Sequence, residues 1–185
     1  MTFAHGANAR THGAAGDFDI ALPGVECRSG GATNDYTLVF TFSNNLASGN
    51  ASVTSGTGNV AGTPAISGNT MTVNLTGVAN DQTLSVTLNG LTDQFLQNLP
   101  DTAVGMSVLI GDVNGNALVN ATDVSAAKIQ SGAPVSNANF RADVNPNGAI
   151  NASDVSTVKS HSGEGLPDLR ESHFALSFAS STIAS

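Results

Sequence analysis

The amino-acid sequence predicts a mainly β protein with a small α-helical module toward its C-terminal end. Short alternating apolar runs dominate the first part of the chain, and Gly, Asn or Ser residues separate them. After Ile110 this alternation gives way to two similar segments, each of which joins a polar loop to a helical pattern. Charged residues are 11% and aromatic residues 5% of the 185 residues, which suits a turn-rich β domain and not a helical bundle.

Seven strand-like segments lie between residues 17 and 110. In the first of them Phe18, Ile20 and Leu22 fall on one face, as expected for a half-buried strand. The seven segments are Asp17–Leu22, Tyr36–Phe42, Ala51–Ser55, Thr63–Ser67, Thr70–Leu75, Gln82–Leu88 and Val104–Ile110. Period-two alternation with frequent turn signals favours an Ig-like β-sandwich of about seven strands, and a barrel built from the same strands fits the pattern as an alternative.

The segment Gly111–Gly132 is repeated as Ala142–Gly163, and more than half of the aligned residues are identical. In each copy a short helical pattern, ATDVSAAKIQSG or ASDVSTVKSHSG, ends at a glycine. An internal repeat this strong indicates a duplicated loop-helix unit. We therefore expect a β domain with an N-terminal arm at residues 1–109, a loop-helix domain at 110–165 and a tail at 166–185.

Both repeated loops place oxygen-bearing side chains at the ligand offsets of an EF-hand-type calcium loop. Calcium takes about six to eight oxygen ligands, and the loops offer no sulfur or imidazole that would suit zinc or copper. Two Asx-turns before helices would explain one such loop, but the repetition of every offset favours two calcium ions. The expected ligands are Asp112, Asn114, Asn116, the Leu118 carbonyl, Asn120 and Asp123 in the first loop, and Asp143, Asn145, Asn147, the Ala149 carbonyl, Asn151 and Asp154 in the second.

The stretches GDVNGNALVNATDVSAAKIQSG and NFRADVNPNGAINASDVSTVKSHSG together resemble a type I dockerin over about residues 110–163. The resemblance implies two calcium ions, a fold that forms only with them, and a cohesin as partner. The usual glycine at the sixth loop position is Ala117 in the first copy, and an alanine at positive φ costs roughly 1 kcal/mol, so we expect a weaker first site. By the same match, the cohesin-binding residues would be Ala121, Thr122, Lys128, Ala152, Ser153 and Lys159.

The preceding stretches, THGAAGDFDIALPGVECRSGG and DYTLVFTF, resemble a domain found ahead of dockerin repeats in large secreted bacterial proteins. Together with calcium loops of low charge, this predicts an extracellular or cell-surface protein. The net charge of −8 argues against a nucleic-acid partner, and no apolar stretch has the length of a membrane helix. Cys27, the single cysteine, is expected to be buried and unreactive, with pairing to another chain as the alternative.

In the tail, Phe174, Leu176 and Phe178 alternate with small residues, which predicts a β-strand that docks on a β domain. Donation of this strand to a neighbouring molecule would give head-to-tail filaments. We therefore expect a calcium-binding structural subunit of a surface or filamentous assembly, with a cohesin-binding adaptor as the alternative. A carbohydrate-binding module is a weaker alternative because the sequence has no Trp and one Tyr, and no motif indicates an enzyme.

Overall fold

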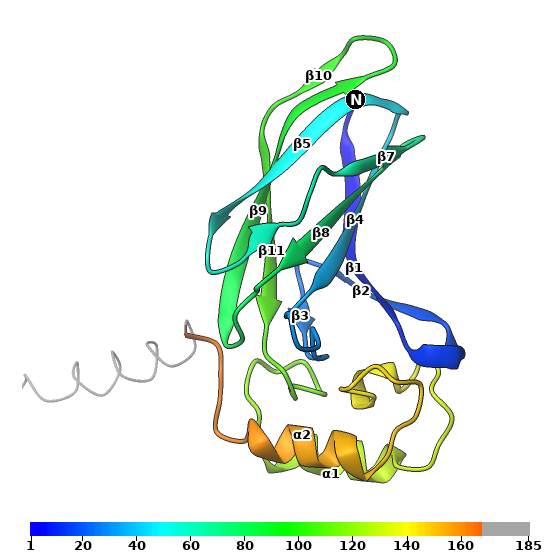
Figure 1. Ribbon diagram of the computed structural model, residues 1–185, viewed down its shortest axis with the longest axis vertical. Helices are drawn as coiled ribbons and strands as arrows, with labels where there is room; N and C mark the ends of the chain where they lie inside the picture. Colours follow the sequence, from blue (N-terminus) through cyan, green and yellow to red (C-terminus); the bar gives the residue numbers. More distant parts are fainter. Residues whose placement is uncertain (168–185) are drawn as a thin grey trace, which may run out of the picture.

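The computed structural model describes residues 1–167, and the predicted tail strand with Phe174, Leu176 and Phe178 lies outside the described residues. The described chain forms eleven strands in two sheets and then two short α-helices (Figure 1). The N-terminus lies at one end of the β layers, and the helices lie beyond the other end. The mainly β fold class with a small α module is therefore confirmed.

The first sheet has the order β2 (Asp17–Leu22), β1 (Phe3–Thr11), β4 (Tyr36–Phe42), β8 (Thr70–Thr76) and β6 (Asn59–Val60), and β7 (Ala65–Ser67) also pairs with β8. The second sheet has the order β10 (Asn98–Leu99), β9 (Gln82–Asp93), β11 (Thr102–Val108) and β3 (Val25–Glu26), and β5 (Leu46–Ser55) also pairs with β9. The pair β11–β3 is parallel, and the other pairs are antiparallel.

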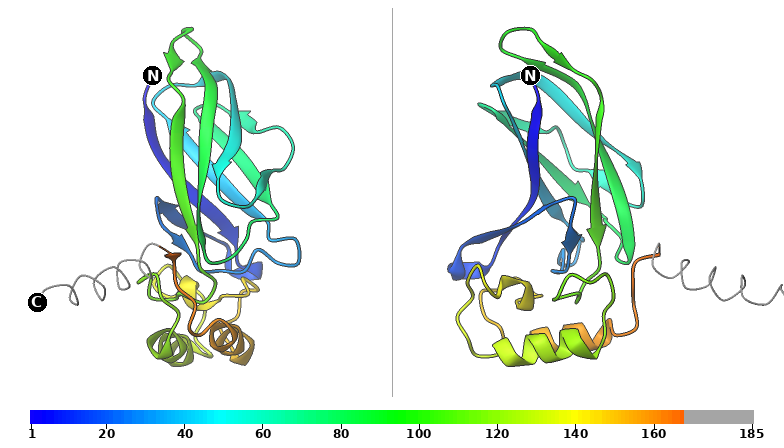
Figure 2. Two further views of the ribbon diagram at one scale, coloured as in Figure 1. Left: turned by 90° about the vertical axis from the view of Figure 1, so that its left-hand side faces the viewer. Right: turned by 180° about the vertical axis from the view of Figure 1, so that it is seen from behind.

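The two sheets pack face to face as separate layers, which Figure 2 shows from two further sides. Alternate residues of each strand enter the space between them, as the period-two pattern predicts. From the first sheet these are Tyr36, Leu38, Phe40, Phe42, Met71, Val73 and Leu75, and from the second Leu84, Val86, Leu88, Leu91, Val104 and Met106. Because no strand pairing joins the sheets within residues 1–167, the structure is a sandwich and not a closed barrel.

The expected N-terminal arm is in fact β1, a nine-residue strand that pairs with β2 on one side and β4 on the other. Its small and polar residues give no apolar alternation, which is why the sequence pattern missed it. A small residue is needed at Gly6, because a Cβ there would lie 2.9 Å from the Cδ1 atom of Phe40. The strands β3, β6 and β10 have two residues each, too few to show a period, so the expected seven strands become eleven.

The helices α1 (Ala121–Gln130) and α2 (Ala152–Ser160) follow the two repeated loops, as predicted. Each helix begins with a capping box. The side chain of Asn120 or Asn151 accepts a hydrogen bond from the backbone of the first turn, and the aspartate three residues later accepts one from the backbone N–H of that asparagine. The buried apolar residues of the helices belong to the same apolar cluster as the core of the sandwich, together with Ile110, Val119 and Leu166. One continuous apolar core therefore crosses the expected domain boundary at residue 109. Two single turns, η1 (Gly13–Ala15) and η2 (Phe140–Ala142), lie where the two parts meet.

Candidate metal centre

The first repeated loop folds around the side chain of Asp112. One carboxylate oxygen accepts hydrogen bonds from the backbone N–H groups of Gly115 (2.9 Å) and Asn116 (3.0 Å), and the other accepts one from Ala117 (2.9 Å). Ala117 holds a φ of 66°, which confirms the expected left-handed backbone at this alanine. Three donors thus fix the carboxylate that opens the first loop.

The last position of each loop is an aspartate in the first turn of the helix that follows. Asp123 accepts from the backbone N–H groups of Asn114 (3.1 Å) and Asn120 (3.0 Å), one on each carboxylate oxygen. Asp154 makes the same two bonds in the second loop, at 3.0 and 2.9 Å. The partial positive charge of the helix start favours a carboxylate here. The loop is therefore closed from its last position, as a calcium loop requires.

The amides at the third loop position are held by hydroxyl groups from the start of each helix. The Asn114 side-chain nitrogen donates to Thr122 Oγ1 at 2.9 Å, and the Asn145 nitrogen donates to Ser153 Oγ at 3.2 Å. Each amide keeps its oxygen as an acceptor, and an amide oxygen has two lone pairs. Thr122 and Ser153, expected as cohesin contacts, thus also orient calcium-loop side chains.

The remaining expected ligands lie along the same loops. The side-chain oxygens of Asn116 and Asn147 each accept from the backbone two residues on, both at 3.0 Å. Leu118 forms an isolated bridge with Gly165, and the Ala149 carbonyl accepts from the Asn151 side chain at 3.2 Å. The predicted donors therefore lie within two short loops, and several of their side chains bond backbone groups of the same loop.

The donor set fits a hard cation. Asp112, Asp123, Asp143 and Asp154 are all fully buried, and burial raises the pKa of Asp112. Buried carboxylates need a compensating cation or many hydrogen bonds. Within residues 1–167 no three His, Cys, Asp or Glu side chains gather at one point, because each loop has two carboxylates and adds amide and backbone oxygens. Such an all-oxygen set suits calcium.

A second group of buried polar residues, which the sequence pattern did not reveal, lies where the β part meets the second loop. His12 Nδ1 lies 2.8 Å from an Asp143 carboxylate oxygen, and His12 Nε2 lies 3.1 Å from Arg28 Nη1. Arg28 donates to both carboxylate oxygens of Glu26, at 2.8 and 2.7 Å. Burial by itself would lower the pKa of Arg28, but the hydrogen-bonded carboxylate of Glu26 raises it above its ordinary value. The charge of Glu26 is thereby neutralised locally, and His12 is left to face Asp143.

The expected cohesin contacts lie on the exposed faces of the two helices. Ala121, Thr122 and Lys128 on α1 are exposed, and so are their repeat equivalents Ala152, Ser153 and Lys159 on α2. Ile129, next to Lys128, has 78% of its surface exposed, whereas the equivalent residue in α2 is Ser160. The two helices therefore offer three pairs of matched exposed positions, two of them polar, and one unmatched apolar side chain.

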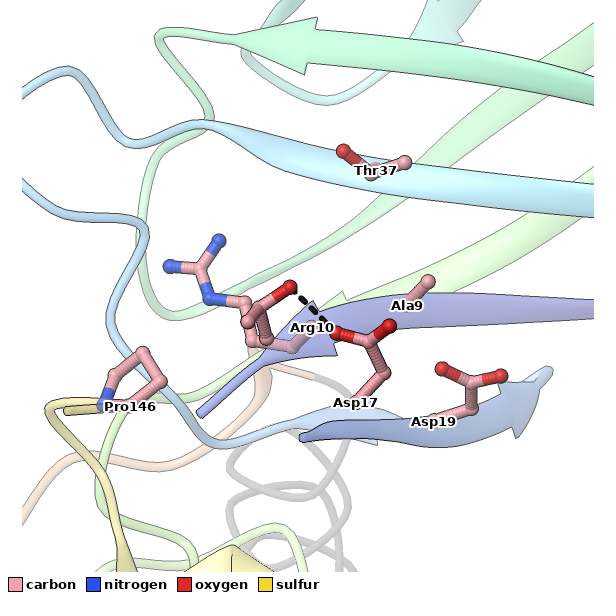
Figure 3. A pocket seen from close by; sticks show the side chains of 7 residues that line it. Ala9, Arg10, Asp17, Asp19, Thr37 and Pro146 are labelled. Atoms are coloured by element: carbon pink, nitrogen blue, oxygen red, sulfur yellow. Dashed lines mark hydrogen bonds between the residues drawn. The ribbon is translucent and has the colours of Figure 1, made fainter. Parts of the chain in front are cut away.

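A shallow pocket on the outer face of the first sheet adjoins the second loop (Figure 3). Asp17 and Asp19 line it from β2, and Pro146 of the second loop closes one end. Several of its polar groups already have partners, since Thr11 donates to Asp17 at 2.6 Å and Arg10 donates to the Asp35 carbonyl at 2.7 Å. The pocket thus marks the contact between the β part and the loop without adding a distinct set of reactive groups.

Fold and site together define a mainly β protein with a duplicated calcium-type loop-helix module. Residues 110–161 match the family described as the dockerin type I domain, so the chain carries a type I dockerin behind a β-rich region. Dockerin domains bind calcium and cohesins, are themselves non-catalytic, and typically occur in secreted or cell-surface proteins. Neither the curated proteins nor the solved structures gave a match to the chain. Within residues 1–167 no helix has the length and apolar character to cross a membrane.

Proposed function

We propose that this chain is an extracellular calcium-binding adaptor that binds a cohesin through its dockerin and holds its β-rich region in a larger assembly. The observation that carries the proposal is the pair of exposed, repeat-equivalent surfaces on α1 and α2. The buried sides of these helices are committed to the core, so their outer sides are the free surface of the module. Dockerin domains are non-catalytic modules, and such a free surface on one of them suits attachment to a partner.

We propose that two calcium ions shape this surface. Calcium would supply the positive charge that the buried carboxylates require, and the protein's part is to hold the oxygens in place. The first ion would be bound by Asp112, Asn114, Asn116, the Leu118 carbonyl, Asn120 and Asp123, and the second by Asp143, Asn145, Asn147, the Ala149 carbonyl, Asn151 and Asp154. Native mass spectrometry with and without chelator tests this directly, and an unchanged mass would exclude calcium binding.

The cohesin proposal is tested with purified cohesin domains and isothermal titration calorimetry. The double variant Lys128→Glu/Lys159→Glu reverses two exposed charges that lie outside the calcium loops. It should lose cohesin binding and keep both calcium ions. Phe95→Ala is the matched control, since Phe95 is 64% exposed at the turn after β9, at the other end of the sandwich. The adaptor proposal would be contradicted if the wild-type chain bound none of the cohesin domains tested. It would also be contradicted if the double variant bound a cohesin as tightly as the wild type.

A filament built by strand donation is a second candidate, and one edge of the second sheet favours it. The strand β11 pairs with β9 along its whole length, but on its other edge β3 covers only Ser107 and Val108 within the described chain. Residues 102–106 therefore present open backbone donors and acceptors. A strand with the pattern of Phe174, Leu176 and Phe178 suits such an edge. The sugar-binding alternative loses support, because Tyr36, the sole tyrosine of the sequence, is buried.

A further inference from the structure

The two calcium loops differ at their fourth position, which is Gly115 in the first and Pro146 in the second. Proline has no backbone N–H, so the second loop lacks one donor that the first loop uses. The Asp143 carboxylate accepts only two backbone bonds from its own loop, from Asn147 at 3.2 Å and Gly148 at 2.8 Å. The His12 ring, 2.8 Å from Asp143 Oδ2, supplies the third contact. A residue of the β1–β2 hairpin thus brings the number of contacts on the Asp143 carboxylate back to three, as in the first loop, although on the oxygen that Gly148 also bonds.

The neighbours of His12 determine which of its ring nitrogens carries the proton. A guanidinium can only donate, so Arg28 Nη1, 3.1 Å away, makes His12 Nε2 the acceptor. The proton then sits on Nδ1 and is donated to Asp143. Phe18 and Phe140 meet the ring edge-on, at centroid distances of 5.2 and 6.1 Å, and fix its orientation.

The backbone of the hairpin turn also lies directly against the second loop. A Cβ at Gly13 would lie 2.3 Å from the Asn147 carbonyl oxygen, and a Cβ at Gly148 would lie 2.7 Å from the His12 carbonyl oxygen. Both glycines have positive φ, at 50° and 88°. Figure 1 shows the same relation, with η1 beside the loop that precedes α2. The first loop differs, because every hydrogen bond given above for the Asp112 carboxylate comes from that loop's own backbone.

We infer that His12 is a positioning residue of the second calcium loop, and that calcium binding there and docking of the β1–β2 hairpin stabilise each other. The inference rests on the proposed calcium binding of the loop. Coupling of two binding events is reciprocal, so a hairpin that orients Asp143 for calcium must itself be held more firmly when calcium is bound. The second site is therefore shared between the β part and the dockerin, whereas the hydrogen bonds that hold the Asp112 carboxylate of the first site come from its own loop.

The test uses calcium titration of the full chain by calorimetry, with three variants. His12→Ala removes the donor and should weaken one of the two sites about 10-fold, as is typical when a group that orients a metal ligand is lost. His12→Asn places an amide N–H near the position of Nδ1 and should restore most of the affinity. His5→Ala changes an exposed histidine of β1, the strand that ends just before His12, and should leave both sites unchanged. Equal affinities in wild type and His12→Ala would overturn the inference.

Hydrogen exchange on the unaltered chain gives an independent measurement if His12→Ala does not fold. Amides of residues 12–18 should exchange at least several-fold more slowly with calcium than with chelator, in step with those of Asn147 and Gly148. Loop amides that become protected while the hairpin amides do not would refute the coupling. A wild-type chain that takes up no calcium would instead refute the proposed function, so the two failures are distinguishable.

Discussion

The ring of Phe18 in β2 stacks on the ring of Phe140 in η2, with centroids 5.5 Å apart and planes 7° from parallel. The guanidinium of Arg28 lies 5.3 Å from the Phe140 centroid, so the same ring also receives a cation–π contact. Phe140 belongs to the connection between the two repeats, and Phe18 and Arg28 belong to the β part. This aromatic contact therefore joins the dockerin to the sandwich beside the polar contact of His12.

Phe140→Ala should lower the free energy of unfolding of the calcium-loaded chain by about 2–3 kcal/mol, less than the loss typical of a fully buried phenylalanine, because the ring is only half-buried. The unfolding transition should also lose cooperativity, since the dockerin and the sandwich would separate before either unfolds. Urea denaturation followed by circular dichroism measures both effects. Phe95→Ala removes an exposed ring at the other end of the molecule and should change little. Equal stabilities of the two variants would show that the stack contributes nothing to docking.

The features that the sequence predicted are those that local pattern encodes. Tyr36–Phe42 is a strand with the expected bounds because its alternation of buried and half-buried residues is regular. The two loops and helices followed from their repeated offsets. The contact of His12 with Asp143 joins residues 131 positions apart, and no local period reports such a pair. Arginine is normally exposed, so composition also gives no sign that Arg28 is buried and paired with Glu26.

Cys27 should be inert in the native protein. Burial raises the pKa of its thiol from 9.0 to about 12, and the sulfur lies 3.6 Å from the Arg141 carbonyl oxygen, to which it donates. A disulfide reagent at pH 8 should therefore modify no thiol in the folded chain and one in denaturant. Rapid labelling of the native, calcium-loaded chain would contradict this burial.

The same shift predicts a loss of stability in alkali. The thiol ionises in the unfolded chain above pH 9 but remains protonated in the folded chain until about pH 12, so the unfolded state gains stability between these values. Stability should fall as the pH rises through this window. Cys27→Ser, which does not ionise there, should show a shallower fall in chemical denaturation at each pH, and an identical slope would contradict the assignment.

Loss of the opening aspartate should be more damaging in the second loop than in the first. Asp143→Ala removes a calcium ligand and leaves the buried His12 Nδ1 without its acceptor, whereas Asp112→Ala affects a loop already strained at Ala117. In thermal melts at fixed calcium, Asp143→Ala should therefore lower Tm by several degrees more. Asn114→Ala and Asn145→Ala serve as a matched pair that tests the loops without disturbing the hairpin. Equal losses from the two aspartate variants would remove the asymmetry.

Truncation after Pro167 separates the filament candidate from the adaptor. Leu166 must be kept, because it is part of the core and its backbone N–H donates to the Ala117 carbonyl at 3.1 Å. Burial of Phe174, Leu176 and Phe178 in a neighbouring molecule would contribute on the order of 5–8 kcal/mol before ordering costs, enough to hold a repeating contact.

If the tail joins molecules, electron microscopy and size-exclusion chromatography should show polymers of the full chain. The truncated chain should be a monomer that still binds calcium. Chelation should then shorten the polymers, since the calcium-dependent dockerin lies between the β-rich region and the tail. Identical assembly of both forms would show that the tail is not the link, and a full chain that is monomeric at every concentration would leave the adaptor as the function.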